Sequence, residues 1–163
     1  MSAAPEQRFY SGEELLALSG LEAMQAVRDG RATPPTISTT LNFTLAEVEF
    51  GRAVFEGTPN ASILNPLGFV HGGWALTLLD SCTGCAAHTT LPAGVGYTTV
   101  ETKGNFVRAI TPETGIVRAE GKVVAQGRTI ITAEGRITDG KGRLLAHGTS
   151  TLIVLRPQGP EGK

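Results

Sequence analysis

The sequence has little net charge, few cysteines and no long apolar run, and each shortage excludes a class of protein. Its 14 basic and 15 acidic residues leave a formal net charge of -1, so no overall positive field favours nucleic acid or anionic lipid. Apolar runs free of polar residues stay below the roughly 18 residues of a membrane-spanning helix, and no basic-then-apolar signal opens the sequence. We therefore expect a cytoplasmic protein with neither nucleic acid nor membrane as a partner.

Metal and redox chemistry have few residues to use. The two cysteines, Cys82 and Cys85, lie three residues apart. With His88 they supply only three metal ligands, on a helix that we expect to be buried. We interpret them as small core residues and expect neither a metal nor a cofactor. The elbow motif of serine hydrolases and the phosphate-binding loop are also absent, which argues against those two classes of enzyme.

Length and composition indicate one globular domain with short additions at both ends. With 163 residues, 40% of them hydrophobic and 18% charged, the chain is long enough to bury a core. Residues 1–35 are expected to form an N-terminal helical segment, because apolar residues recur at helical spacing after Ser11, a helix-capping residue type. We expect Gly20 to divide this segment into two short helices. Residues 36–156 are expected to form the main domain, and residues 157–163 a flexible tail.

The main domain is predicted to contain one long helix and several strands. Residues rich in Thr, Ile, Phe and Val predict strands over 36–50 and 52–56, before an apolar helical segment. Four further strand-like runs follow the helix. They are separated by turn sequences at Pro112, Gln126–Arg128 and Asp139–Gly142.

A glycine falls near the middle of each of these four runs. The four are Gly104, Gly121, Gly135 and Gly148. A glycine inside a strand often marks close approach by another backbone, and here it leaves room for a helix. We therefore predict an α+β fold in which an antiparallel β-sheet of about five to six strands wraps a long central helix.

Residues 64–88 carry the strongest functional signal. Gly72 and Gly73 open the apolar segment, where the first backbone N–H groups of a helix are free to meet an anion or a polarised oxygen. Asp80 lies inside this segment, and no Lys or Arg occupies neighbouring positions on its helix face. Such a carboxylate is costly to bury, so it either has a structural role, capping a loop or contacting an Arg from elsewhere such as Arg108 or Arg128, or takes part in catalysis.

These residues resemble a known family. The pattern N-x2-G-x2-HGG-x6-D runs from Asn65 to Asp80. It is similar to the hotdog-fold acyl-CoA thioesterases of the phenylacetate-degradation type, which resemble the 4-hydroxybenzoyl-CoA thioesterases that use Glu at the acid position. The likeness continues to about Leu155. It implies a hotdog fold and hydrolysis of acyl-CoA thioesters to a carboxylic acid and coenzyme A, without a cofactor.

Three residues are expected to act on the thioester itself. Asp80 is expected to activate water as a general base or to attack the carbonyl carbon directly, and the sequence does not choose between these routes. The Gly72 N–H is expected to bind the negative charge that forms on the carbonyl oxygen. The resemblance implies that Asn65 positions the thioester or the attacking water.

Four more residues are expected to line the substrate: His71, Gly73, Thr99 and Arg128. His71 lies about 13 Å from Asp80 along a helix at 1.5 Å per residue, so its ring is expected to bond to backbone and set the turn. In the resembling family a Ser or Thr at the place of Thr99 lies by the nucleophilic water. Arg128 is a candidate contact for the coenzyme A phosphates, with an ordinary solvated turn residue as the alternative.

Two other functions fit the same fold. One is a non-catalytic acyl-CoA sensor, although the chain has no helix-turn-helix or basic segment for acting on DNA. The other is a hotdog dehydratase, which pairs a His with an acid across a tunnel; the spacing of His71 and Asp80 does not resemble that pattern. The acyl group stays open, because Leu67, Phe69 and Trp74 suit a pocket and a core equally well.

Spacing along the helix also predicts the quaternary structure. Gly72 and Asp80 are eight residues apart, which is about 12 Å along a helix axis. A thioester carbon must lie within roughly 3–3.5 Å of its attacking group while its oxygen meets the N–H donor. One chain therefore cannot complete the site, but a two-fold dimer with antiparallel helices can. We expect a homodimer with shared sites, and the resemblance implies a homotetramer of two such dimers.

Overall fold

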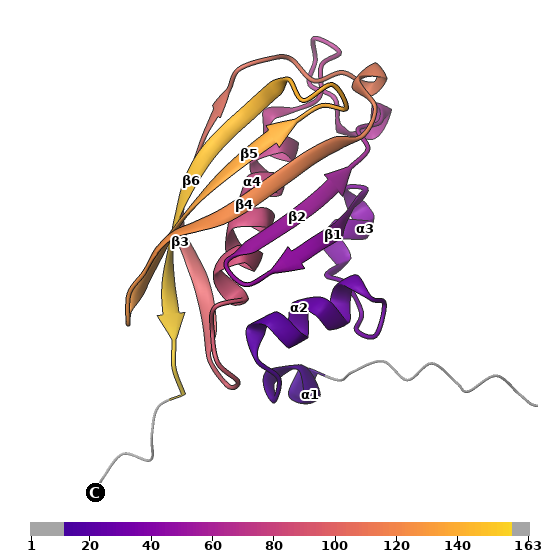
Figure 1. The fold of residues 1–163 in the computed structure, drawn as a ribbon. Coiled ribbons are helices and arrows are strands. Elements are labelled where there is room, and N and C mark those ends of the chain that lie inside the picture. Colours follow the sequence, from indigo (N-terminus) through magenta and orange to yellow (C-terminus); the bar gives the residue numbers. More distant parts are fainter. Residues whose placement is uncertain (1–11, 158–163) are drawn as a thin grey trace, which may run out of the picture.

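The structure, a computed structural model, describes residues 12–157. Within this range a six-stranded sheet curves around one long helix, α4 (Gly72–His88), and shorter helices lie beside them (Figure 1). The shorter helical segments are α1 (Gly12–Leu16), α2 (Gly20–Arg28), α3 (Thr36–Thr40), η1 (Ala61–Ile63) and η2 (Pro112–Thr114). None of the helices within residues 12–157 is long and apolar enough to cross a membrane. The predicted α+β architecture is confirmed.

All neighbouring strands of the sheet run antiparallel, in the order β1-β2-β4-β5-β6-β3. The strands are β1 (Phe43–Glu49), β2 (Arg52–Gly57), β3 (Gly96–Phe106), β4 (Val117–Gln126), β5 (Ile130–Thr138) and β6 (Leu144–Leu155). The strand that directly follows α4 therefore forms one edge of the sheet, beside the last strand of the chain. This position leaves one side of β3 without a partner strand within the described chain.

The start of α4 is fixed by its own sequence. His71 is the N-cap, and its Nδ1 accepts a hydrogen bond of 2.9 Å from the Gly73 N–H, which satisfies one of the free donors of the first turn. At the other end, the Thr89 hydroxyl donates to the Ala86 carbonyl at 2.6 Å and accepts from the Gly51 N–H at 2.7 Å. The helix is thereby joined at its C-terminal end to the β1–β2 turn.

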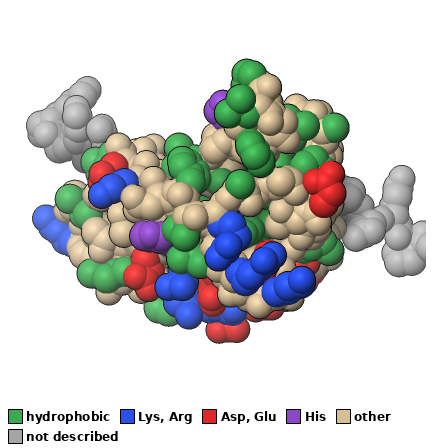
Figure 2. All heavy atoms as spheres, turned by 90° about the horizontal axis from the view of Figure 1, so that it is seen from above, with side chains coloured by type: hydrophobic (Ala, Val, Ile, Leu, Met, Phe, Trp, Pro, Cys, Tyr) green, Lys and Arg blue, Asp and Glu red, His purple; other side chains and the backbone are tan. Residues whose placement is uncertain are grey.

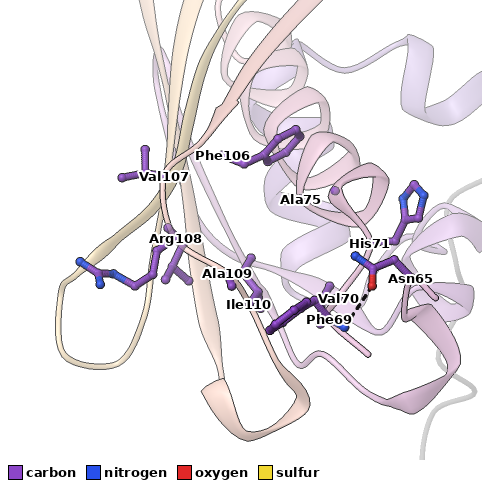
Figure 3. A pocket seen from close by; sticks show the side chains of 12 residues that line it. Asn65, Phe69, Val70, His71, Ala75, Phe106, Val107, Arg108, Ala109 and Ile110 are labelled. Carbon is purple, nitrogen blue, oxygen red and sulfur yellow. Dashed lines mark hydrogen bonds between the residues drawn. The ribbon is translucent and has the colours of Figure 1, made fainter. Parts of the chain in front are cut away.

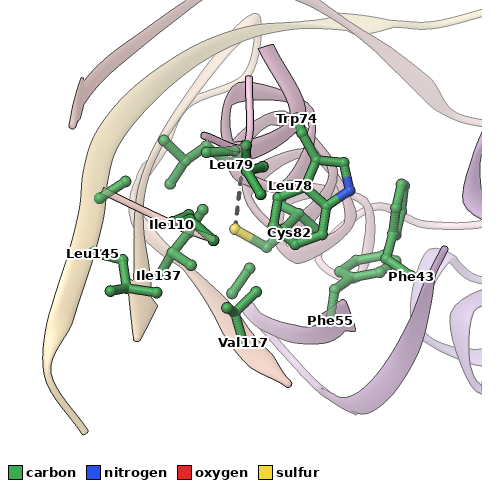
Figure 4. Close-up of a cluster of buried hydrophobic side chains, with 14 of the residues drawn as sticks. Phe43, Phe55, Trp74, Leu78, Leu79, Cys82, Ile110, Val117, Ile137 and Leu145 are labelled. Atoms are coloured by element: carbon green, nitrogen blue, oxygen red, sulfur yellow. Dashed lines mark hydrogen bonds between the residues drawn. The ribbon is translucent and has the colours of Figure 1, made fainter. Parts of the chain in front are cut away.

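The core lies between α4 and the concave face of the sheet (Figure 4). Trp74, Leu78 and Leu79 of the helix are buried against it. On the sheet side, Phe43 and Phe55 meet edge to face, with their ring centroids 5.8 Å apart. Cys82 packs within the same cluster, so the interpretation of this cysteine as a small core residue agrees with the structure.

Three of the four strand glycines make room for the helix, as predicted. A side chain at Gly121 would collide with the Cys82 carbonyl, and one at Gly104 or Gly135 would come within 3.2 Å or less of α4 side chains. Gly148 differs from the prediction, because a side chain there would collide with the Lys103 carbonyl of β3. That glycine therefore allows close pairing of β6 with β3.

The N-terminal helices differ from the prediction in detail. The capping box is formed by Ser19 and Glu22 at the start of α2, whereas the expected cap, Ser11, lies outside the described residues. The predicted division into two short helices at Gly20 is confirmed, and Gly20 is the first residue of the second helix, α2. The Gly20 N–H donates to the Leu91 carbonyl at 2.9 Å, and a side chain at this position would collide with the His88 carbonyl. α2 therefore rests on the C-terminal end of α4.

The first strand also begins later than predicted. Thr36–Thr40 form the short helix α3, in which the Thr40 hydroxyl bonds back to the Thr36 carbonyl at 3.1 Å. Asn42 then adopts a left-handed conformation with φ of 55°, which turns the chain into β1 at Phe43. The β-branched residues of this segment were the reason for predicting a strand, and local hydrogen bonding of Thr competes with that preference.

Candidate active site

A cavity of about 320 Å³ opens at the N-terminal end of α4. The loop before the helix, the helix start and the segment after β3 form its walls (Figure 3). Its lining includes Asn65, Phe69, His71, Gly72, Phe106 and Arg108. Viewed from above in Figure 2, this end of the molecule carries apolar side chains beside a hollow, and a group of Lys and Arg side chains nearby. Three of the predicted site residues, Asn65, His71 and Gly72, thus meet at one end of the fold.

Asn65 shapes the loop that enters the helix. Its Oδ1 accepts hydrogen bonds from the N–H groups of Leu67 at 2.9 Å and Phe69 at 3.2 Å. Because the oxygen faces these two donors, the side-chain NH2 group is the part that remains for a ligand, and it points toward the helix start in Figure 3. Asn65 is therefore both a turn residue and a donor at the cavity.

Gly72 and Gly73 differ in what their N–H groups do. The Gly73 N–H is already bonded to His71 Nδ1 at 2.9 Å, as predicted for the His71 ring. The Gly72 N–H makes no hydrogen bond to any part of the chain that the structure describes. An ideal side chain at Gly72 would come within 3.2 Å of the Phe106 ring. Gly72 is therefore the free donor at the cavity, at the positive end of the helix dipole.

Asp80 is half-buried, eight residues further along α4. Its Oδ1 accepts a hydrogen bond of 3.1 Å from the hydroxyl of Thr102 in β3. No Lys, Arg or His within residues 12–157 forms an ion pair with this carboxylate, so the structural alternative of an Arg partner finds no support there. The lining of the cavity does not include Asp80, and Gly72 and Asp80 of one chain stand at separate places on the helix.

Thr102 was not among the predicted residues, and a β-bulge explains why. Strict alternation from Thr99 puts Glu101 on the same face as Thr99 and Thr102 on the opposite one. The register of β3 against β6 shifts between Thr99 and Glu101, and the extra residue, Val100, returns Thr102 to the helix-facing side. One feature of the sequence could have pointed to this region: Ser150 is a hydroxyl residue in an otherwise apolar row of β6. It lies opposite Thr102.

Other titratable groups on this side of the helix stay neutral. Burial, and then the negative charge of Asp80, raise the pKa of the Cys85 thiol to about 12. Burial likewise raises the pKa values of Cys82 and Tyr97 and lowers that of His88. Neither thiol is therefore a thiolate nucleophile at neutral pH. Among residues 12–157, no three His, Cys, Asp or Glu side chains are grouped to hold a metal ion.

Arg128 lies far from the cavity within one chain. It is exposed in the β4–β5 turn, and the neighbouring Gln126 side chain donates to the Thr90 carbonyl, just beyond the C-terminal end of α4, at 3.2 Å. Arg108 is the arginine that lines the cavity, although its guanidinium points away from the cavity in Figure 3. Thr99 stands on the helix-facing side of β3, opposite buried Leu152.

This chain is similar in sequence to known thioesterases and esterases. The model of the Thioesterase superfamily matches residues 67–146. A Saccharolobus solfataricus protein that is named, provisionally, as an esterase is 32% identical over 71% of this chain and 81% of its own length. A 1,4-dihydroxy-2-naphthoyl-CoA hydrolase of Listeria monocytogenes is 23% identical over 74% of this chain and 96% of its own length.

A solved structure is similar to this chain in fold. The crystal structure of a phenylacetic acid degradation-related protein from Ralstonia eutropha superposes with a TM-score of 0.73 at 25% identity, covering 80% of this chain and 98% of that chain. The chain therefore belongs to the thioesterase superfamily and has the hotdog fold. It is a thioester hydrolase.

Proposed function

We propose that this chain hydrolyses acyl-CoA thioesters at sites shared between two protomers. The observation that carries the proposal is the free Gly72 N–H at the start of the same helix that holds Asp80 without an ion-pair partner among the described residues. The name of the Listeria relative, a CoA-thioester hydrolase, supports coenzyme A as the leaving group. No cofactor or metal is part of the proposal.

The chemistry begins with the carbonyl carbon of the thioester. Addition of water gives a tetrahedral intermediate whose oxygen carries a negative charge, and the Gly72 N–H donates to that oxygen. Such a donor is worth about 2.7–4 kcal/mol in well-studied acyl-transfer sites. Collapse of the intermediate breaks the C–S bond, the coenzyme A thiolate takes up a proton, and the carboxylic acid leaves.

Asp80 has two roles open to it. As a general base it takes the proton of the attacking water. As a nucleophile its oxygen attacks the carbonyl carbon, the C–S bond breaks to release the coenzyme A thiolate, and water hydrolyses the resulting acyl anhydride to the carboxylic acid and free Asp80. Asn65, whose NH2 group faces the cavity, is proposed to hold the thioester or the water, and Thr99 to lie by the attacking water.

The position of β3 supports the shared site. Phe106 of this strand lies beside Gly72, and Thr102 of the same strand lies beside Asp80. The two positions flank Gly104 symmetrically. Antiparallel pairing of two copies of this edge strand about Gly104 would therefore bring the Gly72 end of one protomer to the Asp80 region of the other.

The exposed apolar side chains of this region favour the same pairing. Val100, Phe106 and Val107 are all more than half exposed. A long edge strand with exposed apolar residues invites pairing with another chain. The proposed homotetramer of two dimers rests on the family resemblance, and light scattering of the purified protein tests it.

Coenzyme binding follows from the dimer. Antiparallel helices would bring the C-terminal end of the partner's α4, near which Arg128 lies, toward the cavity of this chain. We therefore keep Arg128 as the proposed contact for the coenzyme A phosphates, supplied by the partner. The cavity of this chain is lined mostly by apolar side chains, which suits the apolar part of such a ligand, while the partner's Arg128 would meet the phosphates.

A thiol-release assay with a panel of acyl-CoA substrates tests the proposed activity. We expect free coenzyme A and a carboxylic acid in equal amounts. Binding of acyl-CoA without thiol release would instead indicate a sensor. Loss or gain of water on the acyl chain, with the thioester intact, would indicate a dehydratase.

A further inference from the structure

Three hydroxyl groups form a continuous chain behind Asp80. The Thr102 hydroxyl, which donates to Asp80 Oδ1, lies 3.1 Å from the Ser150 hydroxyl, and Ser150 lies 2.7 Å from the Thr83 hydroxyl. The Thr83 hydroxyl also lies 2.8 Å from the Leu79 carbonyl. The chain thus crosses from β3 to β6 and ends on the helix that carries Asp80.

The inner members of this chain are fully buried. Ser150 is 2% exposed and Thr83 is 1% exposed. Ser150 stands on the helix-facing side of β6, in the same row as Leu152 and Val154, both buried. An apolar residue would suit that position without any hydrogen bond, and a buried hydroxyl is costly unless it finds a partner. The buried Ser150 hydroxyl is therefore accounted for by its hydrogen-bond partners, the hydroxyls of Thr102 and Thr83.

The direction of the hydrogen bonds follows from counting protons. An ionised carboxylate only accepts, so Thr102 uses its single proton on Asp80. The Thr102 oxygen can then only accept, so the Ser150 hydroxyl donates to it. The Thr83 hydroxyl has a single proton, for which the Leu79 carbonyl at 2.8 Å competes with Ser150 at 2.7 Å. The donors of Thr102 and Ser150 are thereby directed toward the Asp80 carboxylate, and hydrogen bonds aligned in this way strengthen one another.

We propose that Thr102 and Ser150 are positioning residues that hold the Asp80 carboxylate by Oδ1 and leave Oδ2 to face the substrate. This inference rests on the proposed function of Asp80. A carboxylate that is free to rotate presents either oxygen in many orientations, whereas one held by Thr102 presents Oδ2 in one orientation. Ser150 acts through Thr102, because its hydroxyl fixes the rotamer of the Thr102 hydroxyl.

The experiment measures kcat and KM for acyl-CoA hydrolysis in four variants. Thr102→Val keeps the shape but removes the donor, and we expect kcat to fall about 10- to 100-fold with little change in KM. Thr102→Ser keeps the donor and should recover most of that loss. Ser150→Ala should lower kcat less than Thr102→Val does. Thr149→Val, on the outer side of β6, is the matched control and should behave as wild type.

Combining variants separates positioning from general stability. If Ser150 acts through Thr102, the double variant Thr102→Val/Ser150→Ala should be no slower than Thr102→Val alone, because the second link is already broken. If the fold-losses in kcat of the two single variants multiply in the double variant, the proposed hydroxyl chain is wrong. A normal kcat in a folded Thr102→Val protein would also contradict it. Thermal melts identify variants that fail to fold. If Thr102→Val is one of them, kcat is compared between Thr102→Ser, which keeps the donor, and Thr102→Ala, which lacks it.

The outcome for Asp80 keeps the two proposals apart. If Asp80→Asn is inactive while Thr102→Val is fully active, the hydroxyl chain has no role and the function of Asp80 stands. If Asp80→Asn is itself fully active, the proposed function of Asp80 fails, and the positioning of its carboxylate fails with it.

Discussion

Asp80 is the only acidic residue of α4, and its replacement is the most direct test at the scale of single residues. Asp80→Asn preserves the size of the side chain and an oxygen that can accept from Thr102. We expect the fold to persist and the hydrolysis rate to fall at least ~10²-fold, because an amide is neither a base nor a nucleophile. Thiol release and thermal melting measure the two effects. Normal turnover in a variant that melts like wild type would make Asp80 a structural residue.

Arginine substitutions test the coenzyme contact. We expect Arg128→Ala to raise KM for acyl-CoA several-fold, roughly the effect of losing one charge-assisted hydrogen bond, and to leave kcat nearly unchanged. An acyl-pantetheine substrate lacks the nucleotide phosphates and should be hydrolysed equally well by both proteins.

Arg108→Ala is the matched comparison, because Arg108 lines the cavity in the same chain. A rise in KM for Arg108→Ala but not for Arg128→Ala would assign the phosphate contact to Arg108. Equal losses on acyl-CoA and acyl-pantetheine would show that Arg128 supports the scaffold instead.

The residues of the site differ in how far the sequence predicts them. The role of His71 follows from local geometry, since a ring two residues before Gly73 can reach its N–H without any tertiary contact. The link between Thr102 and Asp80 depends on a bulge in β3 and on the pairing of β3 with β6. Neither feature has a signature within the strand itself, so the sequence did not indicate Thr102, whereas Thr99 was selected from the family resemblance.

At the scale of elements, the closest constraint is between α4 and the sheet. Gly121→Ala would place a methyl group against the Cys82 carbonyl, and a helix backbone cannot move aside without displacing the whole core. We expect a loss of at least about 3 kcal/mol of unfolding free energy, at the upper end of overpacking effects.

Gly140→Ala is the control, because a side chain there meets nothing within 4 Å and the residue is not left-handed. Denaturant unfolding of both variants provides the measurement. A Gly121→Ala protein as stable as Gly140→Ala would mean that the helix and β4 are not in contact as described.

Elements with a regular pattern were predicted well, and irregular ones were not. Alternation in β4 and β5 and the turn at residues 139–142 predicted those strands correctly. Thr36–Thr40 resembled a strand by composition but form α3, because Thr hydroxyls bond to nearby carbonyls and Asn42 adopts a left-handed conformation. Composition over five residues does not contain that information.

At the scale of the whole molecule, complementation tests the shared site. Asp80→Asn and Gly72→Pro are each expected to be inactive, for different reasons. When equal amounts are refolded together, about half of the dimers are mixed by random pairing. Each mixed dimer has one site with an intact Gly72 and the partner's intact Asp80, and a second site that lacks both. About a quarter of wild-type activity should therefore return.

The control for this experiment is each variant refolded alone. Mixed dimers are identified by tagging one of the two chains. If tagged mixtures form and remain as inactive as their parents, each chain builds its own site and the shared geometry is wrong.

The edge position of β3 also has a genetic consequence. If each site takes its acid from one protomer and its N–H donor from the other, a defective Asp80 disables one site of each mixed dimer and leaves the second intact, while a dimer of two defective chains loses both. A cell that carries one normal and one Asp80→Asn allele would then keep half of its activity, and the defective allele would not be dominant. Two alleles that are each null, one at Asp80 and one at Gly72, would partly rescue each other when expressed together.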